Sequence, residues 1–179
     1  MFDLKGRVAL VTGAGQGIGT GIARHLARRG ARVLVNDIDA AKAEAAAGSI
    51  QGDDGEAEAL PFDVTDREAV TAALAPRAID IVVNNAGNAG ATPMRPRPFR
   101  ESEPAEWAGP IDVNLHGVMH TTHAVLAGMV ERRHGRIITI ASGAGVIGLP
   151  IGVAPYGAAK GGSISFMRHI AVENALLGV

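Results

Sequence analysis

The chain has 179 residues, a formal net charge of -1 and no cysteine. This length fits one domain spanning residues 1–179, with room for a sizeable core. The near-neutral charge gives no electrostatic reason to expect nucleic acid or a membrane surface as a partner, and the lack of Cys excludes disulfides and thiolate metal sites. Apolar runs are too short for a signal core or a membrane span, so we expect a cytoplasmic protein.

Predicted strands alternate with predicted helices along the chain. This alternation favours the α/β class, with a doubly wound parallel sheet covered by helices on both faces. A capping-box pattern at residues 65–68 starts one helix near Asp66, and Gly30 ends the first helix. The predicted strands are residues 7–11, 31–36, 58–62, 79–83 and 136–140, and the first helix is residues 18–29.

Two long helices are predicted in the second half of the chain. Residues 104–132 have helical spacing but contain Pro110, which we expect to break or kink the helix just before Ile111. Asn114 lies one turn past that point. A further helix opens at Tyr156 and continues to about residue 177.

A glycine cluster, Thr12-Gly13-Ala14-Gly15-Gln16-Gly17-Ile18-Gly19, joins the first strand to the first helix. Glycine lets the backbone turn sharply and approach a ligand closely, and the following helix directs free N–H groups at an anion, so we expect a pyrophosphate here. The spacing T-G-x-x-x-G-x-G matches neither G-x-G-x-x-G nor the P-loop. A glycine-rich turn without a ligand is the alternative.

The second predicted strand ends at Asp37, about twenty residues beyond the glycine cluster, where a dinucleotide fold places a carboxylate against the adenosine ribose hydroxyls. That charge would repel a 2′-phosphate, and Gln16 offers no cation to neutralise one. Gln16 and Asp37 therefore predict NAD, with NADP disfavoured. The alternative is that Asp37 caps the helix that begins near Asp39.

The chemistry of the chain is predicted at Tyr156 and Lys160, which are four residues apart and share one helix face. A free phenol is a poor base at neutral pH, and a neighbouring ammonium favours the phenolate. The pair is therefore a candidate general acid/base, and Ser142, at the carboxyl end of the fifth strand, is placed to donate to the same substrate oxygen. An ordinary Tyr and Lys at a helix start are the alternative.

Three other clusters have weaker interpretations. Asn84-Asn85-Ala86-Gly87 either holds neighbouring loops through side-chain hydrogen bonds or simply turns the chain. Residues 90–103 are rich in proline and arginine, and a solvated connection is favoured over contact with an acidic substrate or carrier. His116, His120 and His123 share a helix face, but no acidic residue is expected to complete a ligand set, so no metal is predicted.

Several features occur together along the chain: the glycine cluster, Asp63 after the third strand, Asn84-Asn85-Ala86-Gly87, Asn114, Ser142 and Tyr156-x-x-x-Lys160. In this combination the chain resembles the short-chain dehydrogenase/reductase family, in its 3-oxoacyl-reductase-like subgroup. The resemblance implies a Rossmann-like fold, a nicotinamide cofactor and hydride transfer. By position, Tyr156 would transfer the proton, Lys160 would favour the phenolate and hold the nicotinamide ribose, Ser142 would orient the substrate oxygen, and Asn114 would hold a relay water. The residues that would line the cofactor are Gly13, Gln16, Gly17, Ile18, Gly19, Asp37, Asp63, Val64, Asn85, Ala86, Gly87, Tyr156 and Lys160.

Members of this family continue beyond the last predicted helix into further strands and a substrate lid, whereas this chain stops at Val179. We therefore expect the C-terminal strands to be missing and the chain to be a fragment. The favoured function is an NAD(H)-dependent oxidoreductase that interconverts a ketone and a secondary alcohol. A silent dinucleotide-binding protein or a truncated remnant is the alternative, and an epimerase or dehydratase is disfavoured. The resemblance also implies a homodimer or homotetramer.

Overall fold

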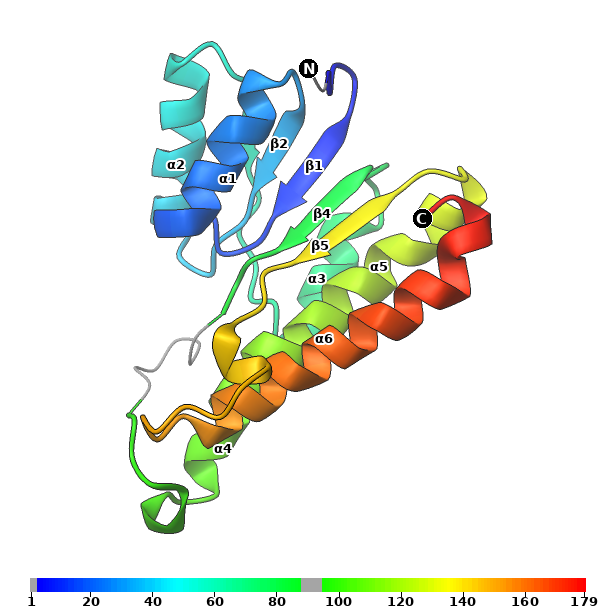
Figure 1. The fold of residues 1–179 in the computed structure, drawn as a ribbon. Helices are drawn as coiled ribbons and strands as arrows, with labels where there is room; N and C mark the ends of the chain where they lie inside the picture. The colour runs from blue at the N-terminus through cyan, green and yellow to red at the C-terminus, as the bar shows by residue number, and fades with distance from the viewer. Residues whose placement is uncertain (1–2, 88–94) are drawn as a thin grey trace.

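The computed structural model describes residues 3–87 and 95–179. Five strands form one parallel sheet in the order β3-β2-β1-β4-β5 (Figure 1). The chain adds β2 and β3 on one side of β1 and then returns to add β4 and β5 on the other, which leaves a crevice at the carboxyl ends of β1 and β4, where open α/β sheets bind ligands. The strands are β1 Val8–Val11, β2 Arg32–Val35, β3 Ala57–Ala59, β4 Ile81–Asn84 and β5 Arg136–Thr139.

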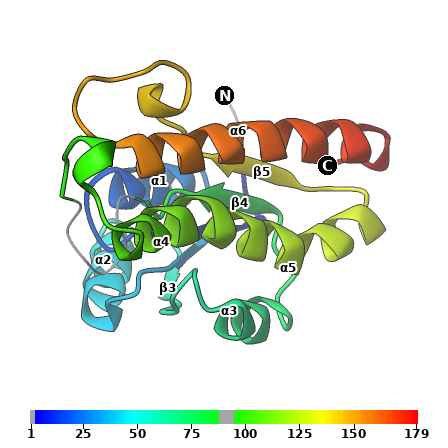
Figure 2. The same cartoon turned by 90° about the horizontal axis from the view of Figure 1, so that it is seen from below.

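Helices cover both faces of this sheet (Figure 2). Successive residues of β1 point to opposite faces, so that Ala9 and Val11 pack in one core cluster with α1 and α2, while Leu10 packs in the other with α3 and α5. The predicted doubly wound α/β fold is confirmed. The helices are α1 Gly17–Arg28, α2 Ala40–Gly52, α3 Arg67–Leu74, α4 Ala105–Ile111, α5 Gly117–Glu131 and α6 Ala154–Asn174.

Of the break or kink predicted at Pro110, the break is wrong. Helix α4 runs through Pro110, and a π-helical turn, Asp112–His116, joins α4 to α5 with helical backbone angles at both junctions. Proline removes one regular hydrogen bond, and the wider turn absorbs this irregularity. The side chain of Asn114 donates from Nδ2 to the carbonyl oxygen of Pro110 at 2.8 Å. Asn114 is therefore buried within a continuous helical segment.

Other boundaries differ by a few residues for identifiable reasons. Strand β3 stops at Ala59 because the carbonyl oxygens of Leu60 and Phe62 accept hydrogen bonds from the side chain of Asn36. Helix α6 begins at Ala154, ahead of the predicted start, since Pro155 fits the first turn, where no N–H donor is needed. Helix α3 starts as predicted, but its cap is the carboxylate of Asp66.

Residues 88–94, which include part of the predicted arginine-rich connection, lie outside the described residues. In the parts that the structure does describe, no helix has an apolar stretch sufficient to cross a bilayer.

Candidate active site

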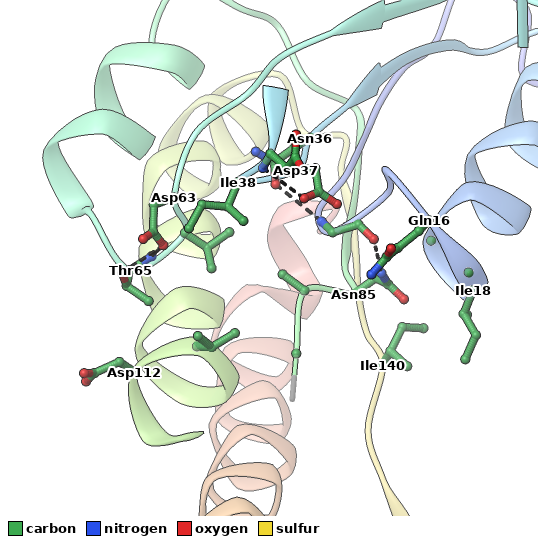
Figure 3. Close-up of a pocket in the computed structure, with 18 of the residues that line it drawn as sticks. Gln16, Ile18, Asn36, Asp37, Ile38, Asp63, Thr65, Asn85, Asp112 and Ile140 are labelled. Carbon is green, nitrogen blue, oxygen red and sulfur yellow. Dashed lines mark hydrogen bonds between the residues drawn. The ribbon is translucent and has the colours of Figure 1, made fainter. Parts of the chain in front are cut away.

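A cleft of about 990 Å³ opens along the carboxyl edge of the sheet (Figure 3). Its walls come from the glycine cluster, the ends of β2 and β4, the segment after β3, and the start of α6. Every residue that the family resemblance assigns to the cofactor lies on these walls. They are Gly13, Gln16, Gly17, Ile18, Gly19, Asp37, Asp63, Val64, Asn85, Ala86, Gly87, Tyr156 and Lys160.

The glycine cluster leaves room for a phosphate group at the start of α1. Gly17 has a left-handed φ of 59°, and no heavy atom of the described residues lies within 4 Å of the position that a Cβ would take there. Gln16 precedes α1 without a side-chain hydrogen bond to it, and no acidic residue stands in the first turn of this helix. The free N–H groups at the helix start therefore face the cleft, which fits a pyrophosphate.

Gly13 and Gly19 are required for a different reason, namely close packing within the loop. A Cβ at Gly13 would lie 2.8 Å from the Cα of Ala86, and one at Gly19 would lie 2.6 Å from Nδ2 of Asn85. Gly13 also has a left-handed φ of 60°. Substitution at either position would push the glycine cluster away from the end of β4.

Asn85 ties the end of β4 to this cluster. Its Nδ2 donates to the carbonyl oxygens of Thr12 at 2.9 Å and Gly13 at 3.0 Å. In return, Oγ1 of Thr12 accepts from the backbone N–H groups of Asn85 and Ala86, both at 3.0 Å. Of the two interpretations of Asn84-Asn85-Ala86-Gly87, the structure supports the one in which the amides hold neighbouring loops.

Asp37 is held rigidly at the wall of the cleft. It is 9% exposed and lines the cleft (Figure 3). Its carboxylate accepts from the N–H of Gly15 at 3.0 Å and the N–H of Asp39 at 3.1 Å. The helix cap proposed as its alternative role belongs to Asp39, whose side chain accepts from the N–H of Lys42. Asp37 therefore presents a fixed negative charge to any ligand in the cleft.

Tyr156 and Lys160 line the same cleft from the first two turns of α6. The ammonium Nζ of Lys160 lies 5.9 Å from the centroid of the Tyr156 ring and donates to the carbonyl oxygen of Ile140 at 2.7 Å. Lys160 is 4% exposed, and this burial lowers its pKa below the usual 10.5. The arrangement places a cation beside the only phenol of the chain.

Asn114 and Ser142 sit at the border of the cleft. A Cβ at Gly87 would lie 3.0 Å from Oδ1 of Asn114 and 3.4 Å from Nζ of Lys160, so these side chains converge on Gly87. Ser142 follows Ala141, which lines the cleft, and Oγ of Ser142 accepts from the N–H of Ala144 at 3.2 Å. A hydroxyl that accepts such a bond keeps its own hydrogen for another acceptor.

No functional role was predicted for Asn36, although this residue organises one side of the site. It is 1% exposed, its Oδ1 accepts from the N–H of Gly13 at 3.4 Å, and its Nδ2 holds the segment after β3 at the carbonyl oxygens of Leu60 and Phe62. Its position could have indicated this role, because Asn36 is a polar residue at the end of an apolar strand and next to Asp37.

An acidic residue does lie beside one of the three histidines, without completing a set of metal ligands. Oδ1 of Asp112 lies 2.9 Å from Nδ1 of His116, and Asp112 lines the cleft. His120 instead contacts the carbonyl oxygen of Val64, and His123 is exposed. No group of three or more potential ligand side chains gathers around one point within residues 3–87 and 95–179.

Comparison with known proteins agrees with this geometry. A family model described as short chain dehydrogenase matches residues 7–179. The 5-keto-D-gluconate 5-reductase of Escherichia coli is 37% identical over an alignment that covers 98% of this chain and 68% of the relative. The 3-oxoacyl-(acyl-carrier-protein) reductase of Vibrio cholerae is 39% identical, with 99% of this chain and 71% of the relative covered.

Solved structures show the same fold. A gluconate 5-dehydrogenase of Burkholderia cenocepacia, in complex with NADP and tartrate, superposes with a TM-score of 0.90 at 37% identity, covering 99% of this chain and 69% of that one. A 3-oxoacyl-(acyl-carrier protein) reductase of Brucella melitensis with bound NAD gives a TM-score of 0.90 at 36% identity, covering 97% and 67%. Similarity to dehydrogenases and reductases, 3-oxoacyl reductases among them, thus extends over nearly the whole chain, and the chain belongs to the short-chain dehydrogenase family.

Proposed function

We propose that this protein is an NAD(H)-dependent oxidoreductase that interconverts a ketone and a secondary alcohol. The observation that carries the proposal is the meeting of Tyr156 and Lys160 with the glycine cluster in one cleft. A protein that only binds a dinucleotide has no need of a phenol beside a buried ammonium. The glycine cluster and Asp37 supply a phosphate site and a carboxylate for a ribose in the same cleft.

The nicotinamide, when bound, supplies or accepts the hydride. In reduction, charge grows on the substrate oxygen, and Tyr156 donates its proton there while Ser142 donates a hydrogen bond. The ammonium of Lys160 favours the phenolate that remains. In oxidation, the phenolate takes the proton back from the alcohol. Asn114, buried behind Gly87, is proposed to hold a water that connects this site to solvent.

The preference for NAD rests on Asp37. Its carboxylate is fixed by Gly15 and Asp39, so it has little freedom to turn away from a 2′-phosphate. Repulsion between this carboxylate and the 2′-phosphate of NADP disfavours NADP. Lys42 lines the same wall. Its Nζ lies 3.5 Å from the carboxylate of Asp39, and this carboxylate partly neutralises the charge of Lys42. Because one structural relative is described with NADP and another with NAD, the preference requires direct measurement.

The names of the relatives suggest two substrate classes, keto-sugar acids and 3-oxoacyl thioesters. Both present a ketone within a carbon chain that ends in a carboxylate or a thioester. Either class is compatible with a hydrogen-bond pair at Tyr156 and Ser142, because this pair contacts only the reacting oxygen.

One experiment tests the proposal on the 179-residue chain. Calorimetric titration with NADH and with NADPH gives the two affinities, and cofactor absorbance with 5-keto-D-gluconate and with a 3-oxoacyl thioester gives turnover. We expect NADH to bind about ten-fold more tightly than NADPH, since one repulsive charge contact is involved. Tyr156→Phe should keep the NADH affinity and lose about a hundred- to ten-thousand-fold in turnover, the range of general acid catalysis.

The outcomes separate the alternatives. NADH binding without turnover of either substrate class would favour the silent dinucleotide-binding protein. A Tyr156→Phe variant that keeps most of its rate would remove Tyr156 from the mechanism. Equal affinities for NADH and NADPH would refute the role of Asp37 in cofactor choice.

A further inference from the structure

The wall of the cleft between α3 and β3 is held from outside by α5. Val64 lines the cleft, and its carbonyl oxygen lies 3.0 Å from Nδ1 of His120. A carbonyl oxygen can only accept, so Nδ1 of His120 carries the hydrogen and donates it. His120 lies on α5, far along the chain from Val64, and its ring is half-buried. This hydrogen bond is a direct link between the helix and the cleft wall.

A second contact on the same helix reinforces this link. A Cβ at Gly117 would lie 2.8 Å from Cγ2 of Val64, so that only glycine lets the helix approach this closely. Gly117 and His120 are three residues apart and therefore lie on one helix face. Helix α5 thus contacts Val64 at its side chain and at its carbonyl oxygen.

The segment that carries Val64 belongs to the Asp37 side of the cleft. The side chain of Asn36, next to Asp37, donates to the carbonyl oxygen of Phe62 at 3.0 Å. Asp63 in turn accepts from the N–H and the hydroxyl of Thr65, both at 2.8 Å (Figure 3). Asn36 therefore holds this segment at Phe62, the Asp63–Thr65 hydrogen bonds shape it locally, and His120 holds it at Val64. The segment faces the ligand space, since the cleft is lined by Phe62, Asp63, Val64 and Thr65.

We propose that His120 is a positioning residue for the cofactor, which holds the backbone of Val64 so that the adenosine half of the dinucleotide meets a preformed wall. This inference rests on the proposed function, because it assigns the adenosine half to the Asp37 side. Without the bond, the 62–65 segment samples other conformations, and a ligand must order it on binding. The hydride step at Tyr156 does not involve this wall.

The neighbouring histidine does not offer its Nδ1 as a substitute donor. The ring of His116 lies beside it, with centroids 6.4 Å apart, but Nδ1 of His116 is engaged with Asp112. Removal of the His120 donor therefore leaves the carbonyl oxygen of Val64 without this partner.

Calorimetric titration with ADP-ribose, which lacks the nicotinamide, tests the inference on the 179-residue chain. His120→Leu removes the donor and keeps an apolar side chain, and we expect about three- to ten-fold weaker binding, the effect of one hydrogen bond. In His120→Asn, Nδ2 is bonded to Cγ, as Nδ1 is in histidine, so the variant keeps a donor at this place. It should bind ADP-ribose within about two-fold of the wild type. His123→Leu makes the same exchange at an exposed position of α5 and should have no effect.

Gly117→Ala disturbs the same wall through the side chain of Val64 and should also weaken ADP-ribose binding. This variant tests the contact if His120→Leu fails to fold. Wild-type affinity in His120→Leu, or an equal loss in His120→Leu and His120→Asn, would overturn the inference. Failure of the wild type to bind ADP-ribose would refute the proposed function and this inference with it, whereas tight wild-type binding that His120→Leu leaves unchanged refutes the inference alone.

Discussion

At the scale of single residues, Lys160 is the most constrained group of the site. Its ammonium is buried, it donates to the carbonyl oxygen of Ile140, and it lies beside the Tyr156 ring. Burial penalises the charged form and lowers the pKa of Lys160 from 10.5. The charge that would assist Tyr156 is thus maintained against a desolvation cost, as is common for groups at functional sites.

This cost predicts a dependence of stability on pH. Because the pKa of Lys160 is lower in the folded state than in the unfolded chain, the unfolded state binds more protons as the pH approaches 10.5. The wild type should therefore gain stability relative to Lys160→Met as the pH rises from the folded pKa toward 10.5. Urea unfolding of both proteins at several alkaline pH values measures the difference. A difference that is constant with pH would contradict the prediction.

At the scale of elements, the segment before Tyr156 is attached to the arginine-rich connection at Arg97. The N–H of Arg97 donates to the carbonyl oxygen of Gly152 at 3.0 Å, and the guanidinium of Arg97 pairs with Glu106 on α4 at 2.7 Å. Part of the connection that was predicted to be merely solvated therefore has a structural role. Three segments meet at this point, just ahead of α6.

Gly152→Ala should loosen this junction. Gly152 has a left-handed φ of 69°, and a Cβ there would lie 2.5 Å from backbone atoms of Arg97. We expect a loss of about 1–3 kcal/mol in the free energy of unfolding, together with lower turnover at unchanged NADH affinity. Thermal unfolding, titration and activity measure these three quantities.

Gly148→Ala is the matched control in the same loop. Its φ is not left-handed, and the position of its Cβ has no described heavy atom within 4 Å. Equal effects of the two substitutions would mean that the loop, and not its junction with Arg97, determines the result.

At the scale of the whole molecule, the two core clusters lie on opposite faces of one sheet and share its strands. Leu34 and Val82 belong to one cluster, while Val33 and Val83 belong to the other. Loss of either cluster exposes the strands of both, so we expect a single cooperative transition. The single-domain organisation, the oligomeric state and the cytoplasmic location stay predictions.

Urea unfolding followed by two signals tests this cooperativity. Trp107 is the only tryptophan, and its ring stacks on Phe99 with centroids 4.9 Å apart, at the end of the molecule that carries α4. Its fluorescence should change at the same urea concentration as the far-ultraviolet circular dichroism. An earlier fluorescence transition would indicate that the α4 region unfolds separately, against the single-domain prediction.

From local patterns alone it is possible to predict the strand and helix order, the glycine cluster and the pairing of Tyr156 with Lys160. These features are local: apolar periodicity, glycine spacing and a four-residue helical interval are readable without knowledge of distant contacts. The family motifs, taken together, also predict that the cofactor residues share one site.

How these parts are held depends on contacts that form only in the folded chain. Helix continuity through Pro110 depends on a π turn and on Asn114, the orientation of Asp37 depends on the N–H of Gly15, and the wall at Val64 depends on His120. Each contact joins groups whose local sequence carries no sign of the partner, because the partner is selected by how strands and helices pack. Local patterns therefore predict which residues form the site, and packing decides their geometry.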